Sequence, residues 1–415
     1  MSGDDQIRKT VDHLFRHQAG QMVSILVRIF GVQYIETIED AVQEAMIAAL
    51  RKWPYGGVPA NQIAWLTQVA KNRVLDQLRR DNKSTNIEDV ELETSKRPDI
   101  RFERELNEDQ LRMIFACCHP ATAADSQVAL TLKLIGGFSV GEIAQAYLAK
   151  EEAIAKMLTR AKQKLRTASL EIPAGQELRE RLDAVLRVLY LMFNEGYTAT
   201  EGEALIRRDL CDEAIRLIRI VIAHQDTAGP KVHALAALFF FQAARFATRS
   251  DVDGNILLLA DQDRSKWDKG MMAAGLEHFR RSAAGDELSA YHIEAEIASI
   301  HTLAPDLDRT NWRRIIECYD QLLKQRFSPI VALNRAVAIG QANDPNAALD
   351  ELSKLAGNYL MTSFYLFHST KAHFLAANGE TERAVAAYEK AAELTRNEPA
   401  RRFLQSRIEM LTSSK

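Results

Sequence analysis

Five basic side chains lie close together in one short segment of the 415-residue chain. Residues 153–170 contain no Asp or Glu, and the basic residues are Lys156, Arg160, Lys162, Lys164 and Arg166. Apolar residues recur in the same segment at helical spacing, at Ile154, Leu158, Ala161 and Leu165. This periodicity is typical of a helix with one buried and one exposed face. The chemistry that an exposed basic face offers is the binding of phosphate groups.

A second helix is predicted directly before the basic one. Ser139 and Glu142 have the spacing of a capping box, which predicts that a helix starts there. A break around residues 148–150 separates the two helices. This order is typical of a helix-turn-helix, whose second helix enters the major groove of DNA. The basic side chains of that helix would contact phosphates, and the side chains at its N-terminus would contact the edges of the nucleobases. The alternative is an ordinary helical hairpin with a solvated basic face.

The composition of the whole chain limits the classes of function. The net charge is −3, so any basic surface must be local. Four cysteines without regular spacing argue against a disulfide framework and suit the cytoplasm, where we expect the protein. The polar N-terminus does not resemble a signal peptide, and no apolar run is long enough to predict a membrane span. Alternating strand patterns are nearly absent, so the sequence predicts an all-α fold.

Changes in composition divide the chain into four parts. Residues 1–83 and 109–170 read as helical modules, and the helix-turn-helix pattern lies in the second of them. Residues 84–108 carry eight acidic and four basic residues with few apolar ones, which predicts a flexible acidic linker. Residues 172–415 read as a long helical extension with an internal echo between Ala348 and Ala384, close to the roughly 34-residue tetratricopeptide period. The alternative for the extension is a non-repetitive helical bundle.

Acidic residues gather at the start of a predicted helix at residues 39–53. They are joined by one glutamine, and the group comprises Glu39, Asp40, Gln43 and Glu44. One interpretation is a docking surface for a basic partner helix. The alternative is that acids are simply favoured near the positive end of the helix dipole.

The next helix, at residues 62–83, combines basic, amide and aromatic side chains. Trp65, Gln68 and Asn72 interleave with Lys71, Arg73, Arg79, Arg80 and Lys83. Basic residues along a backbone path, with an aromatic ring that can stack on an unpaired base, are the means of gripping single-stranded nucleic acid. For Trp65 alone, a place in the hydrophobic core is the competing interpretation.

The order of these motifs resembles a bacterial RNA polymerase sigma factor of the extracytoplasmic-function (ECF) type. The resemblance covers residues 10–168 and includes Asp40-Ala-Val-Gln-Glu-Ala, the helix that contains Trp65 and Arg80, the linker and the helix-turn-helix. It implies that Glu39, Asp40, Gln43 and Glu44 bind the β′ clamp helices of the core polymerase. It implies that the minus-10 element is bound by Trp65, Gln68, Lys71, Asn72, Arg73, Arg79 and Arg80. It also implies that the last helix contacts the β flap and binds the minus-35 element through Glu152, Lys156, Thr159, Arg160, Lys162, Lys164 and Arg166.

The extension resembles a narrower subgroup of this family, in which a large tetratricopeptide-like domain follows the second DNA-binding module. The segments that carry the resemblance are 187–197, 259–268 and 328–337. The resemblance implies that the extension regulates the factor, in place of a separate anti-sigma protein, through intramolecular contact with the other modules.

Two clusters invite an enzymatic or metal-binding interpretation. Cys117, Cys118 and His119 are adjacent, but one tetrahedral zinc ion needs spaced ligands, so a packed helix end is favoured. Asp261, Asp263 and Asp268 lack the glycine and the terminal glutamate of a calcium loop, so helix capping is favoured. No phosphate-binding glycine loop is found either. We therefore expect no enzymatic activity, no cofactor and no metal.

The sequence thus predicts a sigma factor that gives RNA polymerase promoter specificity and helps to open promoter DNA. Its partners are expected to be the core polymerase and promoter DNA, and not a membrane. The alternative is a stand-alone helix-turn-helix regulator whose repeat domain senses a ligand or peptide. The helix at 62–83 favours the sigma factor, because a regulator that binds only duplex DNA does not need to grip a single strand.

Overall fold

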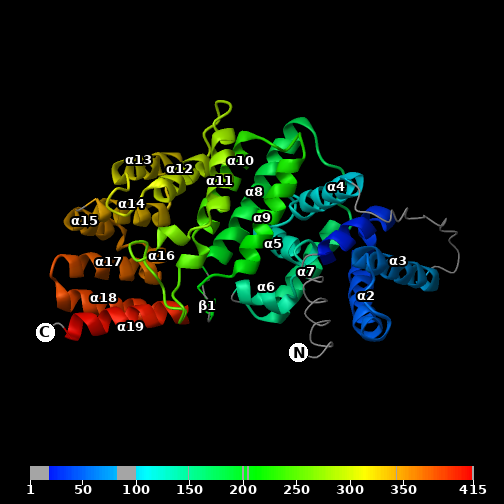
Figure 1. The fold of residues 1–415 in the computed structure, drawn as a ribbon, viewed down its shortest axis with the longest axis horizontal. Helices are drawn as coiled ribbons and strands as arrows, with labels where there is room; N and C mark the ends of the chain where they lie inside the picture. Colours follow the sequence, from blue (N-terminus) through cyan, green and yellow to red (C-terminus); the bar gives the residue numbers. More distant parts are fainter. Residues whose placement is uncertain are drawn as a thin grey trace. The chain divides into compact units, whose positions relative to one another are not determined.

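The computed structural model describes residues 18–81, 100–147, 149–198, 201–202, 205–342 and 344–413, which belong to two compact units. The first unit is Met1–Leu191 with Ala223–Thr227, and the second is Met192–Ile222 with Ala228–Lys415. Both units are built of helices, which confirms the all-α prediction (Figure 1). Strand pairing among the described residues consists of β1 (Glu201–Gly202) parallel to β2 (Arg396–Asn397), and one isolated bridge. None of the described helices is both long and apolar enough to cross a membrane.

The first unit starts, in its described part, with a helix at residues 18–30 and the short η1 (Val32–Tyr34). Its further helices are α2 (Ile35–Gly56), α3 (Gln62–Asp81), α4 (Ile100–Cys117), α5 (Ala124–Leu134), α6 (Val140–Tyr147), α7 (Glu151–Leu165) and the first part of α8 (Gly175–Tyr197). The boundary between the units therefore falls inside α8, and not at residue 172 as the sequence indicated.

Helices α2 and α3 pack against each other through apolar residues. Val42, Ala45, Met46 and Ala49 of α2 are buried, and so are Leu66, Ala70, Val74 and Leu78 of α3. Their spacing of three and four residues is typical of the buried face of a helix. Leu50, which the same spacing would place on the buried face of α2, is instead 37% exposed. Helix α2 is longer at both ends than the predicted helix at residues 39–53, and it continues through Pro54 to Gly56.

Helix α4 corrects the extent of the predicted linker. Residues 84–99 lie outside the described residues, but 100–108 form the first half of α4 and are not an irregular linker. The helix is held by Asp109, whose carboxylate accepts hydrogen bonds from Arg28 at 2.7 Å and from Arg112 at 3.1 Å. Burial raises the pKa of Asp109, although both arginines act in the opposite direction. The acidic composition of residues 100–108 suggested a linker. The ion pairs of this helix are made within the helix itself and with Arg28 of the helix at 18–30, and the second kind cannot be read from the local sequence.

The start of α6 is held by the capping box that the sequence predicted. The amide of Glu142 donates to Ser139 Oγ at 3.1 Å, and the amide of Ser139 donates to Glu142 Oε2 at 2.8 Å. At the other end of α6, the hydroxyl of Tyr147 donates to the carbonyl of Asp125 at 2.5 Å. Gly141 lets α6 approach α7, since a Cβ there would lie 3.0 Å from Glu151 Oε1. These contacts set α7 at a fixed angle to α5 and α6.

The second unit continues α8 into a succession of helices. They are α9 (Arg208–Ala223), α10 (Pro230–Ala243), η2 (Phe246–Thr248), η3 (Arg264–Lys266), α11 (Lys269–Ser282), α12 (Ala290–Leu303), α13 (Trp312–Gln325), α14 (Pro329–Gln341), α15 (Pro345–Leu355), α16 (Tyr359–Thr362), α17 (Tyr365–Ala377), α18 (Thr381–Leu394) and α19 (Glu398–Ser413). From α12 to α15 and from α16 to α19, consecutive helices pack against each other, as Figure 1 shows for α17, α18 and α19, and α15 packs on α17.

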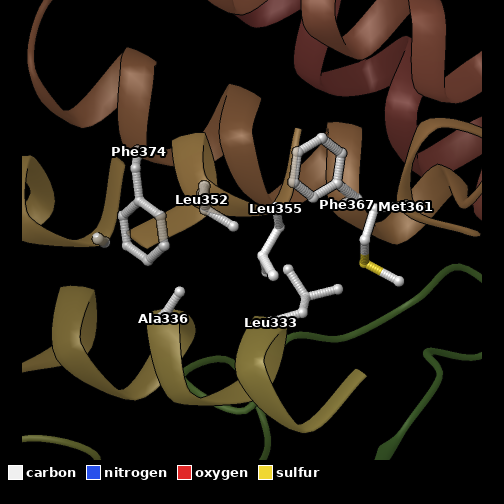
Figure 2. Close-up of a cluster of buried hydrophobic side chains, with 8 residues drawn as sticks. Leu333, Ala336, Leu352, Leu355, Met361, Phe367 and Phe374 are labelled. Carbon is white, nitrogen blue, oxygen red and sulfur yellow. The ribbon is translucent and has the colours of Figure 1, made fainter. Parts of the chain in front are cut away.

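Small residues let these helices pack closely. Ala348 of α15 and Ala384 of α18, the two positions of the sequence echo, are both completely buried. Gly379 has φ of 76° in the turn between α17 and α18, a conformation that favours glycine. One apolar cluster joins α14 to α17 and contains Leu333, Ala336, Leu352, Leu355, Met361, Phe367 and Phe374 (Figure 2).

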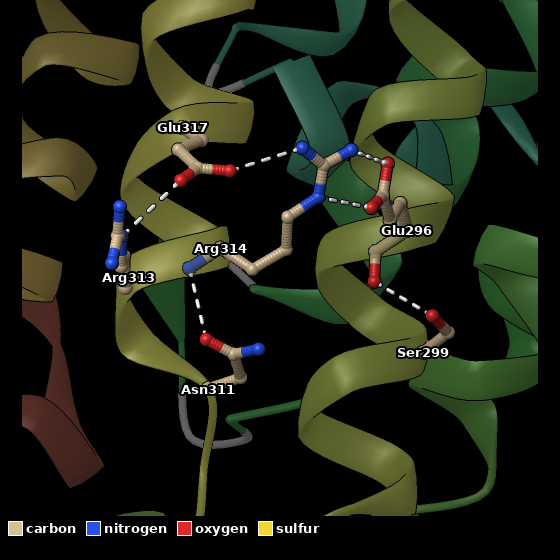
Figure 3. A network of polar contacts seen from close by, with 6 residues as sticks. All are labelled: Glu296, Ser299, Asn311, Arg313, Arg314 and Glu317. Atoms are coloured by element: carbon tan, nitrogen blue, oxygen red, sulfur yellow. Dashed lines mark hydrogen bonds and ion pairs between the residues drawn. The ribbon is translucent and has the colours of Figure 1, made fainter.

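A polar network ties α13 to α12. The guanidinium of Arg314 donates to both carboxylate oxygens of Glu296, at 2.6 and 3.1 Å, and also to Glu317 at 3.1 Å (Figure 3). These bonds raise the pKa of Arg314. A fork-to-fork contact of this kind fixes the angle between two helices as well as adding stability.

The aspartates around residue 265 cap helices, as the sequence predicted. Asp263 Oδ1 accepts a hydrogen bond from the amide of Ser265 at 3.0 Å, and Asp268 Oδ1 accepts one from the amide of Met271 at 2.9 Å.

Candidate functional site

Helix α7 presents three different surfaces. The apolar stripe is fully used, since Ile154, Leu158, Ala161 and Leu165 are all buried. A second surface faces α2, and a third is exposed to solvent. The basic residues do not form the single exposed face that the sequence indicated, because Lys162 and Arg166 contact α2 and Lys164 contacts Ala121.

The contact between α7 and α2 centres on Lys162 and Glu39. Lys162 Nζ lies 2.5 Å from Glu39 Oε2, and the two side chains are only 15% and 10% exposed. The contact does not have hydrogen-bond geometry at Glu39 Oε2, so it acts as a Coulombic pair. Because both groups are largely withdrawn from water, solvent screens their attraction only weakly. Removal of either charge would leave the other buried without its ion-pair partner, which is energetically costly.

Two further groups belong to this charge cluster. Lys133 of α5 is near enough for Glu39 and Lys162 to affect it, and burial lowers the pKa of its ammonium group. Cys117 is fully buried, and burial with the nearby Cys118 and Glu39 raises the pKa of its thiol. Glu39 therefore lies near groups from α4, α5 and α7, and its ion pair is with Lys162.

The same surface of α7 continues for one more turn. Arg166 forms an ion pair with Glu36, one turn before Glu39 on α2. Both of these side chains are close to half exposed, so this pair contributes less than the inner one. Lys164 Nζ donates to the carbonyl of Ala121 at 3.0 Å. Three of the five predicted DNA-binding bases thus make contacts inside the first unit.

The remaining polar residues of α7 are exposed. Glu152, Lys156, Thr159 and Arg160 follow one another at helical spacing on the N-terminal two thirds of the helix. Among the described residues, Lys156 and Arg160 form no ion pair, and the hydroxyl of Thr159 donates to the carbonyl of Ala155 at 2.9 Å. This surface, which we call the open face of α7, can accept an external polyanion without any rearrangement.

The acidic group of α2 is also divided. Asp40, Gln43 and Glu44 are exposed, and Glu44 lies 3.4 Å from Arg73 of α3. Glu39 is only 8% exposed, which corrects the prediction that all four residues share an accessible surface. The physical reason is the helix period, which turns position 39 toward α5 and α7 while positions 40, 43 and 44 point to solvent.

Helix α3 carries a row of exposed and half-exposed groups on one face. Trp65, Gln68, Asn72 and Arg79 recur at spacings of three, four and seven, and Gln68 Nε2 donates to Asn72 Oδ1 at 3.0 Å. Trp65 is half-buried with its ring 5.7 Å from that of Trp53, so it is both packed and partly accessible. Arg73 and Arg80 are exposed, but Lys71 is only 6% exposed, which corrects its expected place on the surface.

The adjacent cysteines form part of a packed helix end. Cys117 and Cys118 are both fully buried at the end of α4, and Cys118 Sγ lies 3.9 Å from Thr131 Oγ1. Burial raises the pKa of Cys118 to about 12. In the described part of the chain, no three His, Cys, Asp or Glu side chains are grouped so that they could hold a metal ion.

Two charged residues at or near the α2–α7 contact were not predicted from the sequence. Glu36 is one helical turn before Glu39, so the acidic surface of α2 could have been extended to it. Lys133 is a single lysine in an apolar helix, and nothing in its local pattern indicates a carboxylate partner almost one hundred residues away.

Comparison with known proteins supports two parts of the chain separately. Residues 14–84 match the model of sigma-70 region 2, and residues 181–283 match a family of unknown function, DUF6596. An uncharacterized protein of Rhizobium meliloti (strain 1021) is 34% identical over 404 residues, which cover 95% of this chain and 94% of that protein. No solved structure matches the chain.

Replacement of Lys162 by Gln is expected to loosen α7 from α2. Glu39 would then keep its charge in a buried place without its ion-pair partner. We expect the opening free energy of α7 to fall by about 3 kcal/mol, the lower end for breaking a buried ion pair. Hydrogen exchange of the α2 and α7 amides measures this change.

Lys156→Gln is the matched control, since it removes the same charge from the open face of the same helix. It should leave the exchange of α2 and α7 unchanged. The double variant Glu39→Gln with Lys162→Gln should cost less than the sum of the single changes, because the two groups are coupled. Equal protection in Lys162→Gln and Lys156→Gln would contradict the Glu39–Lys162 contact.

Proposed function

This chain belongs to the sigma-70 family, and we propose that within it the chain is an ECF-type sigma factor. In this role it directs bacterial RNA polymerase to particular promoters and helps to open the duplex. The observation that carries the proposal is the sigma-70 region 2 match, which spans α2 and α3. A stand-alone regulator that binds only duplex DNA has no use for such a region.

The surfaces of α2 and α3 support distinct tasks for the two helices. Asp40, Gln43 and Glu44 give α2 an exposed acidic surface suited to a basic partner helix, which in this family is part of the polymerase clamp. On α3, the half-buried ring of Trp65 lies one turn before Gln68 and two turns before Asn72. A ring that is already held in place by packing can stack on an unpaired base with little further loss of side-chain entropy.

The α2–α7 contact adds a regulatory element to the proposal. While Lys162 and Arg166 bind Glu39 and Glu36, neither pair of groups can bind anything else. In our proposal this is the resting form of the free chain, and the core polymerase binds the neighbouring Asp40, Gln43 and Glu44 and displaces α7 from Glu36 and Glu39. Binding of the polymerase would then release the C-terminal part of α7 for the minus-35 element.

The extension is the proposed regulator of these modules. The Rhizobium meliloti protein is similar across the extension as well as across region 2, so the two parts occur together in both chains. A deletion after Ser169 is a poor test, because Arg181 belongs to the first unit and donates to the carbonyl of Phe115 at 2.7 Å. Point changes in the full-length chain avoid this damage.

Reversal of two acidic charges on α2 should abolish binding to the polymerase. Asp40→Lys with Glu44→Lys places like charges across the proposed interface, which costs several kcal/mol. We expect the affinity for core polymerase to fall by about two orders of magnitude or more, and promoter-specific transcription in vitro to be lost with it. Fluorescence anisotropy with labelled protein measures the affinity.

The control makes the same two reversals at exposed positions of the second unit, Asp350→Lys with Glu389→Lys. It should bind core polymerase like the unaltered chain. Unchanged affinity in the α2 variant would remove the docking role of these residues. Loss of affinity in both variants would point to a non-specific effect of net charge.

Arg160→Ala should weaken promoter binding by the assembled polymerase. A lost base contact would cost about 1–3 kcal/mol and relax sequence preference at one position of the minus-35 element. A lost phosphate contact would weaken all sequences alike and reduce the salt dependence. Binding curves on promoter variants at several salt concentrations separate the two results.

Lys390→Ala, at an exposed position of α18, serves as control. Unchanged affinity and preference in Arg160→Ala would show that the open face of α7 does not touch DNA.

A further inference from the structure

The second unit contains a cavity of about 560 Å³ that none of the proposed DNA or polymerase contacts uses. It is lined by residues of α12, α13, α14, α17, α18 and α19, together with the loop at 256–260. Sites for small organic molecules usually have volumes of about 300–1,000 Å³, so this cavity is large enough for one.

The loop that closes one side of the cavity is firmly anchored. Gln262 is buried, its Nε2 donates to the carbonyl of Leu257 at 3.0 Å, and Arg245 donates to its Oε1 at 3.2 Å. Arg264 donates to the carbonyls of His301 and Ala304, both at 2.7 Å. Ile256, Leu258, Leu259 and Ala260 thereby become a fixed apolar wall. This gives a structural role to the segment 259–268, which the sequence analysis had singled out.

The opposite walls are mainly aromatic. They include Trp312, Tyr319, Tyr365, Phe374, Tyr388 and Phe403. Phe374 is held in place from behind by the apolar cluster of α14 to α17 (Figure 2). Gly340 packs directly on this ring, since a Cβ at position 340 would lie 2.1 Å from Phe374 Cε1. The cavity is therefore a rigid space with apolar walls.

The charges around the cavity are strongly one-sided. Among its described lining residues there is one permanent cation, Arg407 of α19, and there is no Asp or Glu. The guanidinium lies over the ring of Phe403, 5.1 Å from its centre, and forms no ion pair with any described residue. A half-buried guanidinium without a carboxylate is costly, and an anion entering the cavity would offset that cost.

The polar part of the lining also contains two histidines, together with Asn334, Gln341, Ser369 and Thr370. Burial, Arg245 and Arg264 lower the pKa of His301 to about 4, and burial and Arg407 lower the pKa of His373. Both imidazoles are therefore neutral near pH 7. The described lining residues then carry a net charge of +1, from Arg407. His301 Nδ1 is buried without a hydrogen-bond partner among the described residues.

We propose that this cavity binds a small organic carboxylate with an apolar body. Its carboxylate would pair with Arg407, and its body would lie among the aromatic side chains and the wall at 256–260. An organic cation has no acidic partner here, and a doubly charged phosphate would need more than one cation. The site belongs to the second unit alone, so the proposal stands independently of the sigma factor assignment.

Calorimetric titration of the full-length protein with three eight-carbon compounds tests the recognition of the charge. Octanoate, octan-1-ol and octylamine share an alkyl chain and differ in the head group. We expect octanoate to bind roughly ten to a hundred times more tightly than octan-1-ol, the usual gain from a charge-assisted contact. Octylamine should not bind.

Variants of Arg407 locate the interaction. Arg407→Gln should reduce octanoate affinity to that of octan-1-ol. Arg402→Gln removes the same charge from the same helix outside the cavity and should bind octanoate normally. Arg407→Glu should reverse the preference, so that octylamine binds and octanoate does not. A gain of this kind cannot come from a misfolded variant, and thermal unfolding by circular dichroism checks each chain.

Three results would overturn the proposal. One is equal affinity for octanoate and octan-1-ol, another is octanoate binding that survives Arg407→Gln, and the third is no binding of octanoate. A tripeptide with a C-terminal leucine is the last ligand to test. If it binds through Arg407 while octanoate does not, the cavity recognises the carboxyl end of a peptide and the small-ligand proposal is wrong.

Discussion

A carboxylate removed from water needs a cation beside it, and Glu39 imposes this requirement on the first unit. It is 8% exposed and forms an ion pair with Lys162 of α7, and its charge also acts on Lys133 of α5. The helix at the start of region 2 and the basic helix near residue 160 are far apart in sequence. This one charge cluster requires them to meet.

The contact gives α7 two sets of bases with different availability. Lys156 and Arg160 are exposed, whereas Lys162 and Arg166 are occupied by acids of α2. Salt screens the outer pair of Arg166 and Glu36 more than the inner pair, because the outer side chains are close to half exposed. Added salt alone would therefore weaken the ion pair of Arg166 and Glu36 and leave the pair of Glu39 and Lys162 in place. A partner that replaces α7 on α2 has to supply its own positive charge, which is what we propose of the polymerase.

Local patterns in the sequence predicted the helices and much of their packing. The capping box of Ser139 and Glu142 and the buried stripe from Ile154 to Leu165 follow from interactions within a few residues, so the sequence alone could establish them. The helical start of α4 at residues 100–108 could not be recognised, because its support comes from Arg28, a distant residue. The burial of Glu39 and Lys71 was missed for the same reason. From the sequence alone a charged residue is predicted to be exposed, because the residues from other helices that surround it or pair with it are not known.

The distance between α2 and α7 is the most direct test of this account. Spin labels at Ile47 and Gln163, both exposed, report on it through double electron–electron resonance. The account predicts one short distance in the free chain and a longer one once core polymerase is bound. With the α2 variant that carries lysine at positions 40 and 44, the short distance should persist in the presence of polymerase. An unchanged short distance in the complex of the unaltered chain with polymerase would contradict the proposed release of α7 from α2.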